Sequence, residues 1–283
     1  MAVRILRGLK ALSAPPIATA GCVIEPKKCR VAAIGNFDGL HRGHQKLLQR
    51  VCDCVRDKNE QRKESGTELW ESLLLTFYPH PAVVLGQVPT LPQLDSLRIA
   101  VTQLDQIGID NLCLLRFDSA FAQKSAEDFV QEVLCKRLNV FHLVVGPDAA
   151  VGRARAGTVS VLADLLQQRG RTLEVVEFEE QNGSKVSSRE IRSIIERGDV
   201  HIAAEQLGRF FCLEGRVVRG AGRGKGIGFP TANLAVKSQV LPETGVYAGF
   251  VRYALQRHPC VCNIGVRPSF GGGQLTIEAH LLQ

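Results

Sequence analysis

Short apolar runs alternate with longer segments of helical periodicity between residues 31 and 178. Strand-like runs occur at 31–35, 73–81, 110–118, 141–146 and 171–178. Segments in which apolar residues recur with helical spacing lie between them, at 44–57, 96–108, 125–139 and 159–170. Strands and helices in strict alternation are typical of a doubly wound sheet, whose ligand binds at the carboxyl ends of the strands. The pattern therefore predicts an α/β, Rossmann-like domain built on a parallel sheet.

The secondary structure that the sequence predicts changes in the last third of the chain. Residues 187–198, SSREIRSIIERG, still predict a helix, because Ser187 and Glu190 have capping-box spacing and Gly198 ends the run. Residues 211–283 instead show short β-rich stretches separated by Gly and Pro, without helical spacing. With 283 residues the chain is long enough for two domains. We expect an α/β domain over 1–204 and a small all-β domain over 205–283.

The balance of charge favours an anionic partner. The formal net charge is +7 and the isoelectric point is about 9.0, which suits nucleic acid, a membrane surface or a phosphorylated small molecule. The chain has no run of five basic residues, only 6% of its residues are aromatic, and no nucleic-acid-binding motif is present. A polyphosphate ligand is therefore expected, rather than nucleic acid or a membrane. The amino-terminal residues lack the pattern of a secretory signal, so a cytoplasmic protein is expected.

Nine cysteines are spread along the chain. Their number is odd and no C-x-x-C pair is present, so neither a disulfide framework nor a zinc or redox motif is indicated. We interpret them as buried, reduced thiols. Isolated histidines such as His142 and His201 are interpreted as ordinary core or surface residues.

The segment 34–45, IGNFDGLHRGHQ, follows the first predicted strand and precedes the first predicted helix. It contains a glycine-rich turn and two histidines, His41 and His44. Backbone amides at a helix start and the helix dipole favour phosphate, and histidines there can donate hydrogen bonds to phosphate oxygens. Fixed donors of this kind stabilise the charge that develops when the α-phosphorus of ATP is attacked.

The long motif G-x-F-D-x-x-H-x-G-H resembles the nucleotidyltransferases that form dinucleotide and CDP-linked cofactors. The resemblance implies that His41 and His44 are catalytic phosphate ligands. It also implies ATP contacts from the rest of the motif, at Gly35, Asn36, Phe37, Asp38 and Gly43. Such enzymes have a serine-rich turn before a late helix, which VSSREIR at 186–192 resembles. Ser187 and Ser188 would then bind ATP, and Arg192 would stabilise the leaving pyrophosphate.

A glycine cluster, GAGRGKGIG, occupies residues 220–228. It is neither a P-loop, because Lys225 is followed by Gly, nor a dinucleotide fingerprint, because no window satisfies G-x-G-x-x-G. Together with PTANL, GVYAG, NIGVRPSFGG and IEAHLL it resembles the riboflavin kinase module, a small antiparallel β-barrel. The resemblance implies the following roles: ATP phosphates bound by Gly222, Gly224 and Gly228, Mg²⁺ and phosphates held by Thr231 and Asn233, and Glu278 as general base.

The two modules in this order resemble the bacterial bifunctional riboflavin kinase/FMN adenylyltransferase family, also called FAD synthetases, over nearly the whole chain. The resemblance implies FAD biosynthesis with ATP, riboflavin and FMN as substrates: ATP phosphorylates riboflavin to FMN, and a second ATP adenylylates FMN to FAD with release of pyrophosphate. The sequence does not specify an oligomeric state.

Three departures from the family pattern leave alternatives open. Residues 145–152 read VGPDAAVG, so Ala149 and Val151 replace family aromatics near the expected flavin pocket, whereas Asp148 remains as a flavin-side contact. Tyr78 and Ala82 replace an acidic residue and an arginine. The chain ends at Gln283, where the family continues through further strands and a helix, so we expect a fragment or a damaged kinase half. The alternatives are an adenylyltransferase alone and a non-catalytic flavin- or nucleotide-binding protein.

Overall fold

The computed structural model describes residues 3–7, 28–62, 69–181, 184–220, 230–254, 256–267 and 274–282. The chain forms two compact units. The first combines Met1–Leu91 with Ala100–Val186, and the second combines Pro92–Ile99 with Ser187–Gln283. The second unit thus includes helices α7 (Ser188–Glu196) and α8 (Val200–Leu207), which the predicted boundary after residue 204 assigns largely to the first domain.

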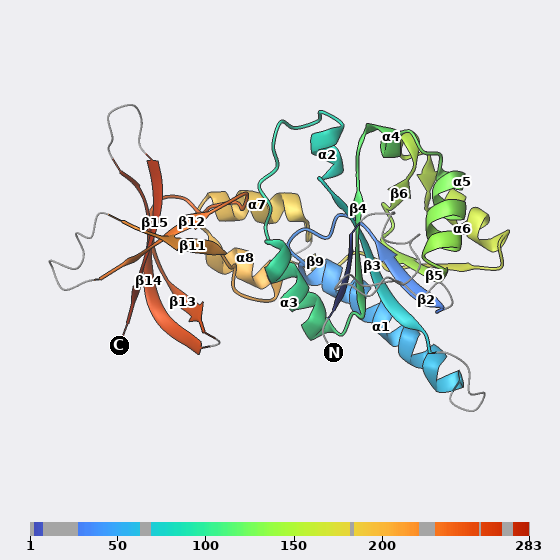
Figure 1. Ribbon diagram of the computed structural model, residues 1–283, viewed down its shortest axis with the longest axis horizontal. Coiled ribbons are helices and arrows are strands. Elements are labelled where there is room, and N and C mark those ends of the chain that lie inside the picture. The colour runs from blue at the N-terminus through green and yellow to red at the C-terminus, as the bar shows by residue number, and fades with distance from the viewer. Residues whose placement is uncertain are drawn as a thin grey trace, which may run out of the picture. The chain divides into compact units, whose positions relative to one another are not determined.

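The first unit is built on a six-stranded sheet in the order β1-β4-β3-β2-β5-β8, and every neighbouring pair is parallel (Figure 1). The strands are β1 (Arg4–Arg7), β2 (Arg30–Ile34), β3 (Glu71–Tyr78), β4 (Asn111–Arg116), β5 (Val140–Val145) and β8 (Thr172–Val175). Five of them coincide with predicted strands. Strand β1 was not predicted, because its four residues lie in a basic amino-terminal stretch. The predicted parallel α/β fold is confirmed.

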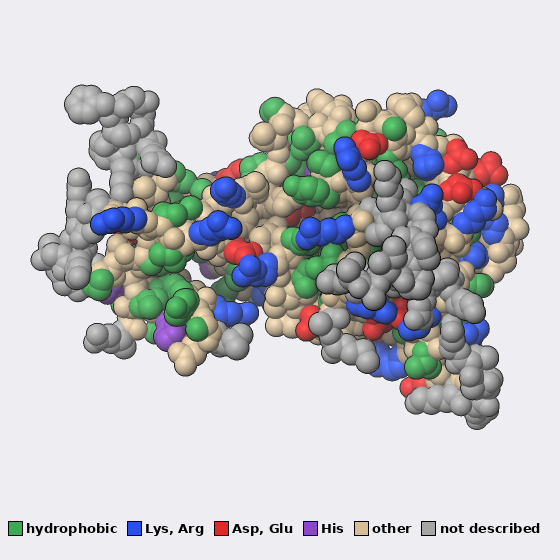
Figure 2. All heavy atoms as spheres, viewed as in Figure 1, with side chains coloured by type: hydrophobic (Ala, Val, Ile, Leu, Met, Phe, Trp, Pro, Cys, Tyr) green, Lys and Arg blue, Asp and Glu red, His purple; other side chains and the backbone are tan. Residues whose placement is uncertain are grey.

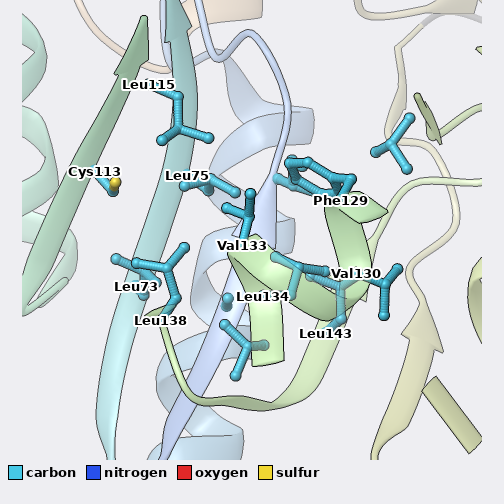
Figure 3. Close-up of a cluster of buried hydrophobic side chains, with 14 of the residues drawn as sticks. Leu73, Leu75, Cys113, Leu115, Phe129, Val130, Val133, Leu134, Leu138 and Leu143 are labelled. Carbon is cyan, nitrogen blue, oxygen red and sulfur yellow. The ribbon is translucent and has the colours of Figure 1, made fainter. Parts of the chain in front are cut away.

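Helices cover both faces of this sheet. Helices α1 (Arg42–Arg62) and α3 (Leu97–Ile107) contribute to one buried cluster, together with β-strand residues such as Val31 and Leu74. The π-helix η2 (Phe129–Arg137) and helix α6 (Val159–Gln167) contribute to the other cluster. Figure 3 shows η2 packed on the strands through side chains that include Phe129 and Val133. The alternation of β2 residues between the two clusters fixes which face of the sheet each helix covers.

Short elements connect the main ones. They are helices α2 (Pro81–Val84), α4 (Ser119–Ala122), α5 (Ala126–Asp128) and η3 (Arg153–Arg155), the hairpin of β6 (Ala150–Val151) with β7 (Gly157–Thr158), and the hairpin of β9 (Glu180–Gln181) with β10 (Ser184–Lys185). The hairpin of β9 and β10 brings Lys185 back toward the carboxyl end of the parallel sheet.

The second unit contains a five-stranded antiparallel sheet in the order β11-β12-β15-β14-β13. Its strands are β11 (Gly215–Val218), β12 (Ala232–Val236), β13 (Gly245–Tyr253), β14 (Gln256–Arg267) and β15 (Gln274–Leu281). The predicted antiparallel second domain is confirmed. Among the strands that the structure describes, β11 and β13 each have one neighbour, so closure into a barrel stays a prediction.

The segment Pro92–Ile99 is held in the second unit by a buried ion pair. Arg209 donates to both carboxylate oxygens of Asp95 at 2.6 Å. Gln239 adds a backbone link, because its side-chain amide donates to the carbonyl of Leu94 at 3.3 Å and accepts from the amide of Glu214 at 2.8 Å. Buried charges require such partners, so this pairing ties a distant stretch of sequence to the second unit.

The positive charge of the chain is not gathered at one place on the visible surface. On the face drawn in Figure 2, Lys and Arg side chains are dispersed among acidic, apolar and other groups instead of forming one basic patch.

The eight cysteines in the described part of the chain are free thiols, as predicted. The expectation that all are buried is wrong: three are buried (Cys54, Cys113 and Cys260), Cys212 is exposed, and the other four are partly buried. Cys212 precedes β11 in an irregular connection.

Candidate functional site

A strained turn joins the end of β2 to the start of α1. Phe37, Gly39 and Leu40 have positive φ angles of 47°, 87° and 41°. Neighbouring strand β3 holds the turn, because the Gly35 amide donates to the Leu75 carbonyl at 3.1 Å and the Thr76 hydroxyl donates to the Asn36 carbonyl at 2.9 Å. Left-handed backbone at non-glycine residues is costly and concentrates at ligand-binding sites. The turn lies at the carboxyl end of the sheet, where such folds bind ligands.

His41 and His44 lie together at the amino-terminal end of α1. Their rings stack with centroids 3.7 Å apart and an interplanar angle of 18°. The backbone amide of His44 donates to His41 Nδ1 at 3.4 Å. Since Nδ1 accepts, the neutral imidazole of His41 has its proton on Nε2, where it can be donated to a ligand. His44 Nδ1 is buried and has no hydrogen-bond partner within the described part of the chain.

Both imidazoles are neutral at pH 7. Burial lowers the pKa of His41 from 6.5 to about 4, with a further contribution from the positive charge of Lys185. Burial lowers the pKa of His44 well below its usual value, assisted by His41 and Lys185. An anion beside these rings would oppose all of these effects, because it favours the charged form. The buried imidazole of His41, the half-buried imidazole of His44, a nearby lysine and a helix start together form a site suited to phosphate.

Gly43 allows the His41 ring to lie against the first turn of α1. A Cβ atom at this position would lie 3.3 Å from two atoms of that ring. At Gly35, a Cβ atom would lie 3.0 Å from the Phe37 ring. That ring is buried in the core beneath the turn, so Phe37 can contact a nucleotide only through its backbone. The two glycines therefore let backbone and aromatic rings pack closely in the motif.

Three residues near Asp148 were not predicted from the sequence: Arg155, Phe178 and Lys185. Lys185 Nζ lies 2.7 Å from a carboxylate oxygen of Asp148 and 3.4 Å from the centre of the Phe178 ring. Arg155 donates to the backbone carbonyl of Asp148 at 2.8 Å. Asp148, predicted on the flavin side, is thus joined to Lys185, whose charge acts on both histidines. Lys185 and Phe178 belong to no sequence motif and are brought here by the segment after β8.

The altered VGPDAAVG segment packs into the core. Val151 is buried in the cluster under η2 and α6, and Ala149 packs against the same cluster. Tyr78 is exposed at the end of β3, and Ala82 lies in α2. The small side chains at 149 and 151 therefore fill interior space, and in the first unit Phe178 is the aromatic residue that lies beside Asp148 and Lys185.

The serine-rich turn forms the start of α7 in the second unit. The Ser187 hydroxyl accepts from the Glu190 amide at 3.3 Å, which confirms the predicted cap. Arg192 Nε donates to the carbonyl of Pro92 at 3.0 Å. Ser188 is the first residue of this helix.

The predicted kinase residues lie partly on adjacent strands. Asn233 of β12 and Glu278 of β15 are direct cross-strand partners, and Glu278 is also opposite Asn263 of β14. Directly opposed residues point to the same face, so these three polar side chains form one row. Sequence reasoning did not find Asn263. A Cβ atom at Gly220 would lie 2.2 Å from the Asn233 side chain, so that glycine permits their close approach.

The other predicted kinase residues precede β12 in the sequence. Thr231 is exposed and precedes β12. Gly222, Gly224 and Gly228 lie outside the described residues.

Comparison with protein families matches each half of the chain to a known family. The family described as FAD synthetase matches residues 24–190, and the family described as riboflavin kinase matches residues 207–283. The class is therefore a flavin-metabolising transferase with a nucleotidyltransferase domain and a kinase domain.

Individual proteins that are similar to this chain indicate a particular family within this class. The chain is 34% identical over 281 residues to the bifunctional riboflavin kinase/FMN adenylyltransferase of Escherichia coli K12, covering 99% of this chain and 83% of that protein. It is 35% identical over 242 residues to the Bacillus subtilis protein of the same name, covering 85% and 73%. A solved structure named as a macrolide-efflux protein from Streptococcus pneumoniae superposes with a TM-score of 0.81 at 26% identity, covering 99% of this chain and 84% of that one.

The chain belongs to the bifunctional riboflavin kinase/FMN adenylyltransferase family. Among the helices that the structure describes, none has the length and apolar character needed to cross a membrane.

Proposed function

We propose that the first unit transfers the adenylyl group of ATP to FMN at the turn of His41 and His44. The observation that carries this proposal is the stacked pair of neutral imidazoles at the start of α1, with the buried Nδ1 of His44 lacking a partner among the described residues. A buried polar atom without a partner is costly, and a bound phosphate would supply one.

The chemistry requires fixed positive potential and donors rather than a covalent intermediate. A phosphate oxygen of FMN attacks the α-phosphorus of ATP, the bond from that phosphorus to the bridging oxygen breaks, and pyrophosphate leaves. Charge grows on the nonbridging oxygens and on pyrophosphate, where Nε2–H of His41, His44 and the dipole of α1 can stabilise it. Gly35, Asn36, Asp38 and Gly43 would contact ATP mainly through the turn's backbone. By motif resemblance, Ser187, Ser188 and Arg192 would bind its phosphates.

On the flavin side, Asp148 is the residue we propose to contact FMN. Its carboxylate is paired with Lys185, so either member of that pair can exchange partners when an anionic flavin phosphate binds. Phe178 offers a ring beside the same pair. The substrates are small molecules, and we place the reaction in the cytoplasm, in keeping with the free thiols of the described cysteines.

In the second unit we propose that ATP phosphorylates riboflavin, with Glu278 accepting the proton of the ribityl hydroxyl. The row of Asn233, Glu278 and Asn263 supports this role, because it gathers oxygen donors beside a potential base. Hard oxygen donors suit Mg²⁺, so Thr231 and Asn233 would hold that ion. When bound, Mg²⁺ would neutralise charge on the ATP phosphates.

Isotopically labelled ATP tests both proposed reactions, because it shows which phosphorus atom of ATP is transferred to the flavin. With FMN and ATP labelled at the α-phosphorus, we expect the label in FAD and none in pyrophosphate. With riboflavin and ATP labelled at the γ-phosphorus, we expect the label in FMN. Chromatographic separation of the flavins reads out both reactions. Tight flavin or ATP binding without label transfer in either reaction would contradict the proposed functions.

A further inference from the structure

Three potential metal ligands from separate elements meet in the first unit. Cys54 of α1, His142 of β5 and Glu174 of β8 offer one ligand atom each, and these atoms all lie within 4.8 Å of one another. Cys54 follows His44 by ten residues on α1, so at about 1.5 Å per residue it lies roughly 15 Å further along the helix. The cluster is therefore distinct from the phosphate site.

The orientation of His142 directs a ring nitrogen into the cluster. Nδ1 lies 2.7 Å from the Thr172 hydroxyl oxygen, and that hydroxyl reaches the Phe141 carbonyl at 3.5 Å. In the tautomer in which Nδ1–H donates to Thr172, the lone pair of Nε2 faces Glu174. A second partner on the outer nitrogen is the usual way in which proteins orient a metal-binding histidine.

The inner nitrogen of His142 is poorly satisfied without a cation. Nε2 is buried, has no hydrogen-bond partner among the described residues, and lies 3.4 Å from a carboxylate oxygen of Glu174. In the tautomer with Nδ1 protonated and Nε2 bare, two acceptors face each other and repel; in the other tautomer Nε2–H points at Glu174, and a metal ion would displace that proton. A positive ion between the two acceptors would turn their repulsion into attraction.

Two of the three separations between ligand atoms suit a tetrahedral ion, and the third, between Cys54 and His142, is within 4.8 Å. Zinc bonds of about 2.0–2.3 Å place neighbouring ligand atoms about 3.3–3.8 Å apart in a tetrahedron. Glu174 Oε2 lies 3.4 Å from His142 Nε2 and 3.8 Å from Cys54 Sγ. Sulfur and imidazole nitrogen select a borderline-soft transition metal over Mg²⁺ or Ca²⁺.

Nearby positive charges set a limit on affinity. Arg50 donates to both oxygens of Glu174, at 2.6 Å and 3.1 Å, and the charge of Lys58 also acts on His142. A thiolate and a carboxylate balance a divalent ion, and Arg50 can remain as an outer partner of Glu174. The two cations nevertheless oppose another positive charge, so we expect weaker binding than at a four-ligand structural site.

We propose that Cys54, His142 and Glu174 bind one divalent transition metal ion of the zinc class, with water as the fourth ligand. Such an ion would join α1 to β5 and β8. Because it binds the folded chain, it would raise the midpoint of thermal unfolding as its concentration increases.

The first test uses Co²⁺ as a spectroscopic probe for zinc on the full, reduced chain. We expect saturation at one ion per chain, with a thiolate-to-cobalt charge-transfer band and intense visible bands of tetrahedral Co²⁺, both abolished by added Zn²⁺. A spectrum of octahedral Co²⁺ without a charge-transfer band in the wild-type chain would overturn the proposal without recourse to any variant.

Variants then assign the ligands. Cys54→Ser and His142→Gln should lose the charge-transfer band, whereas Cys52→Ser, a matched change on the same helix, should keep it. Thr172→Val should lower affinity about 10- to 100-fold while leaving the spectrum intact, as expected of an outer partner. Near-ultraviolet circular dichroism verifies folding of each variant. Equal loss of the band in Cys52→Ser and Cys54→Ser would overturn the assignment to Cys54.

Discussion

At the scale of single residues, the phosphate site depends on two histidines that folding keeps uncharged. Burial makes protonation of His41 and His44 unfavourable, and Lys185 adds to the effect. Neutral rings donate hydrogen bonds through one nitrogen only, so the acceptor role of His41 Nδ1 fixes which atom faces a ligand. The depressed pKa values also make the stability of the chain depend on pH in a defined direction.

Acid sensitivity of folding should be smaller when His41 is replaced. The folded pKa of His41 is about 4 and its ordinary value is 6.5. Below pH 6.5 the unfolded chain binds a proton that the folded chain does not, so the free energy of unfolding decreases as pH falls toward 4. His41→Gln removes this linkage and should reduce the slope by up to about 1.4 kcal/mol per pH unit.

Urea denaturation of the wild type and of His41→Gln across this pH range measures the difference. The control is His201→Gln, an exposed position on α8, which should follow the wild-type curve. Parallel curves for the wild type and His41→Gln would show that the His41 ring is not held in its neutral form by the fold.

At the scale of elements, the site is formed by the junction of β2 and α1. The turn is held by β3, and Gly43 leaves room for the His41 ring against the helix. The same helix buries Leu48 and Val51 in the core, so the position of its first turn is coupled to the packing of the sheet. A small displacement at this junction should therefore affect chemistry more than folding.

Replacement of Gly43 by Ala should lower FAD formation. The new Cβ atom would lie 3.3 Å from the His41 ring, so the ring must shift by a few tenths of an ångström. A misplacement of about 1 Å costs about 100-fold in rate, so we expect this smaller shift to lower the rate up to about 10-fold. Steady-state FAD formation is measured, with thermal unfolding as a check on folding. Gly249→Ala serves as the control, because its new Cβ atom would lie 3.9 Å from the Cys260 sulfur, an ordinary van der Waals distance that requires no shift. Unchanged activity in Gly43→Ala would contradict the assigned position of the ring.

The sequence predicted elements and motifs more fully than contacts between distant segments. The strand-helix alternation and the Ser187 cap depend on neighbouring residues, and the structure confirms both. Within the predicted all-β domain, strand β12 (Ala232–Val236) has no distinct strand pattern in the sequence, because its five residues overlap the PTANL motif after the glycine cluster. Lys185 was missed for a different reason. It reaches the site through tertiary folding, and no spacing in the sequence indicates that.

At the scale of the whole molecule, the chain combines two units that need not unfold together. The second unit recruits Pro92–Ile99 from within the sequence of the first, and the pair of Asp95 with Arg209 holds that segment. Removal of one member of a buried pair leaves an uncompensated charge, which costs about 3–5 kcal/mol. Loss of this pair should therefore weaken the second unit selectively.

Asp95→Ala should accordingly shorten the half-life of riboflavin kinase activity on heating more than that of FAD formation. Residual activities after timed incubation measure both. Asp53→Ala, which breaks an exposed pair with Arg56 on α1, is the control and should leave both half-lives near those of the wild type. Equal losses of the two activities in Asp95→Ala would show that the units unfold as one.

The central claim is that two chemically independent sites lie on one chain. Substitution of one key residue in each site, in separate variants, tests this claim. His44→Ala should lower FAD formation from FMN about 100- to 1,000-fold while riboflavin phosphorylation continues, because a transition-state donor is lost in one site only. Glu278→Gln should lower phosphorylation about 100-fold or more and leave FAD formation unchanged. Both reactions are followed by chromatography of the flavins for each variant. Loss of both activities in either correctly folded variant would contradict the two-site account.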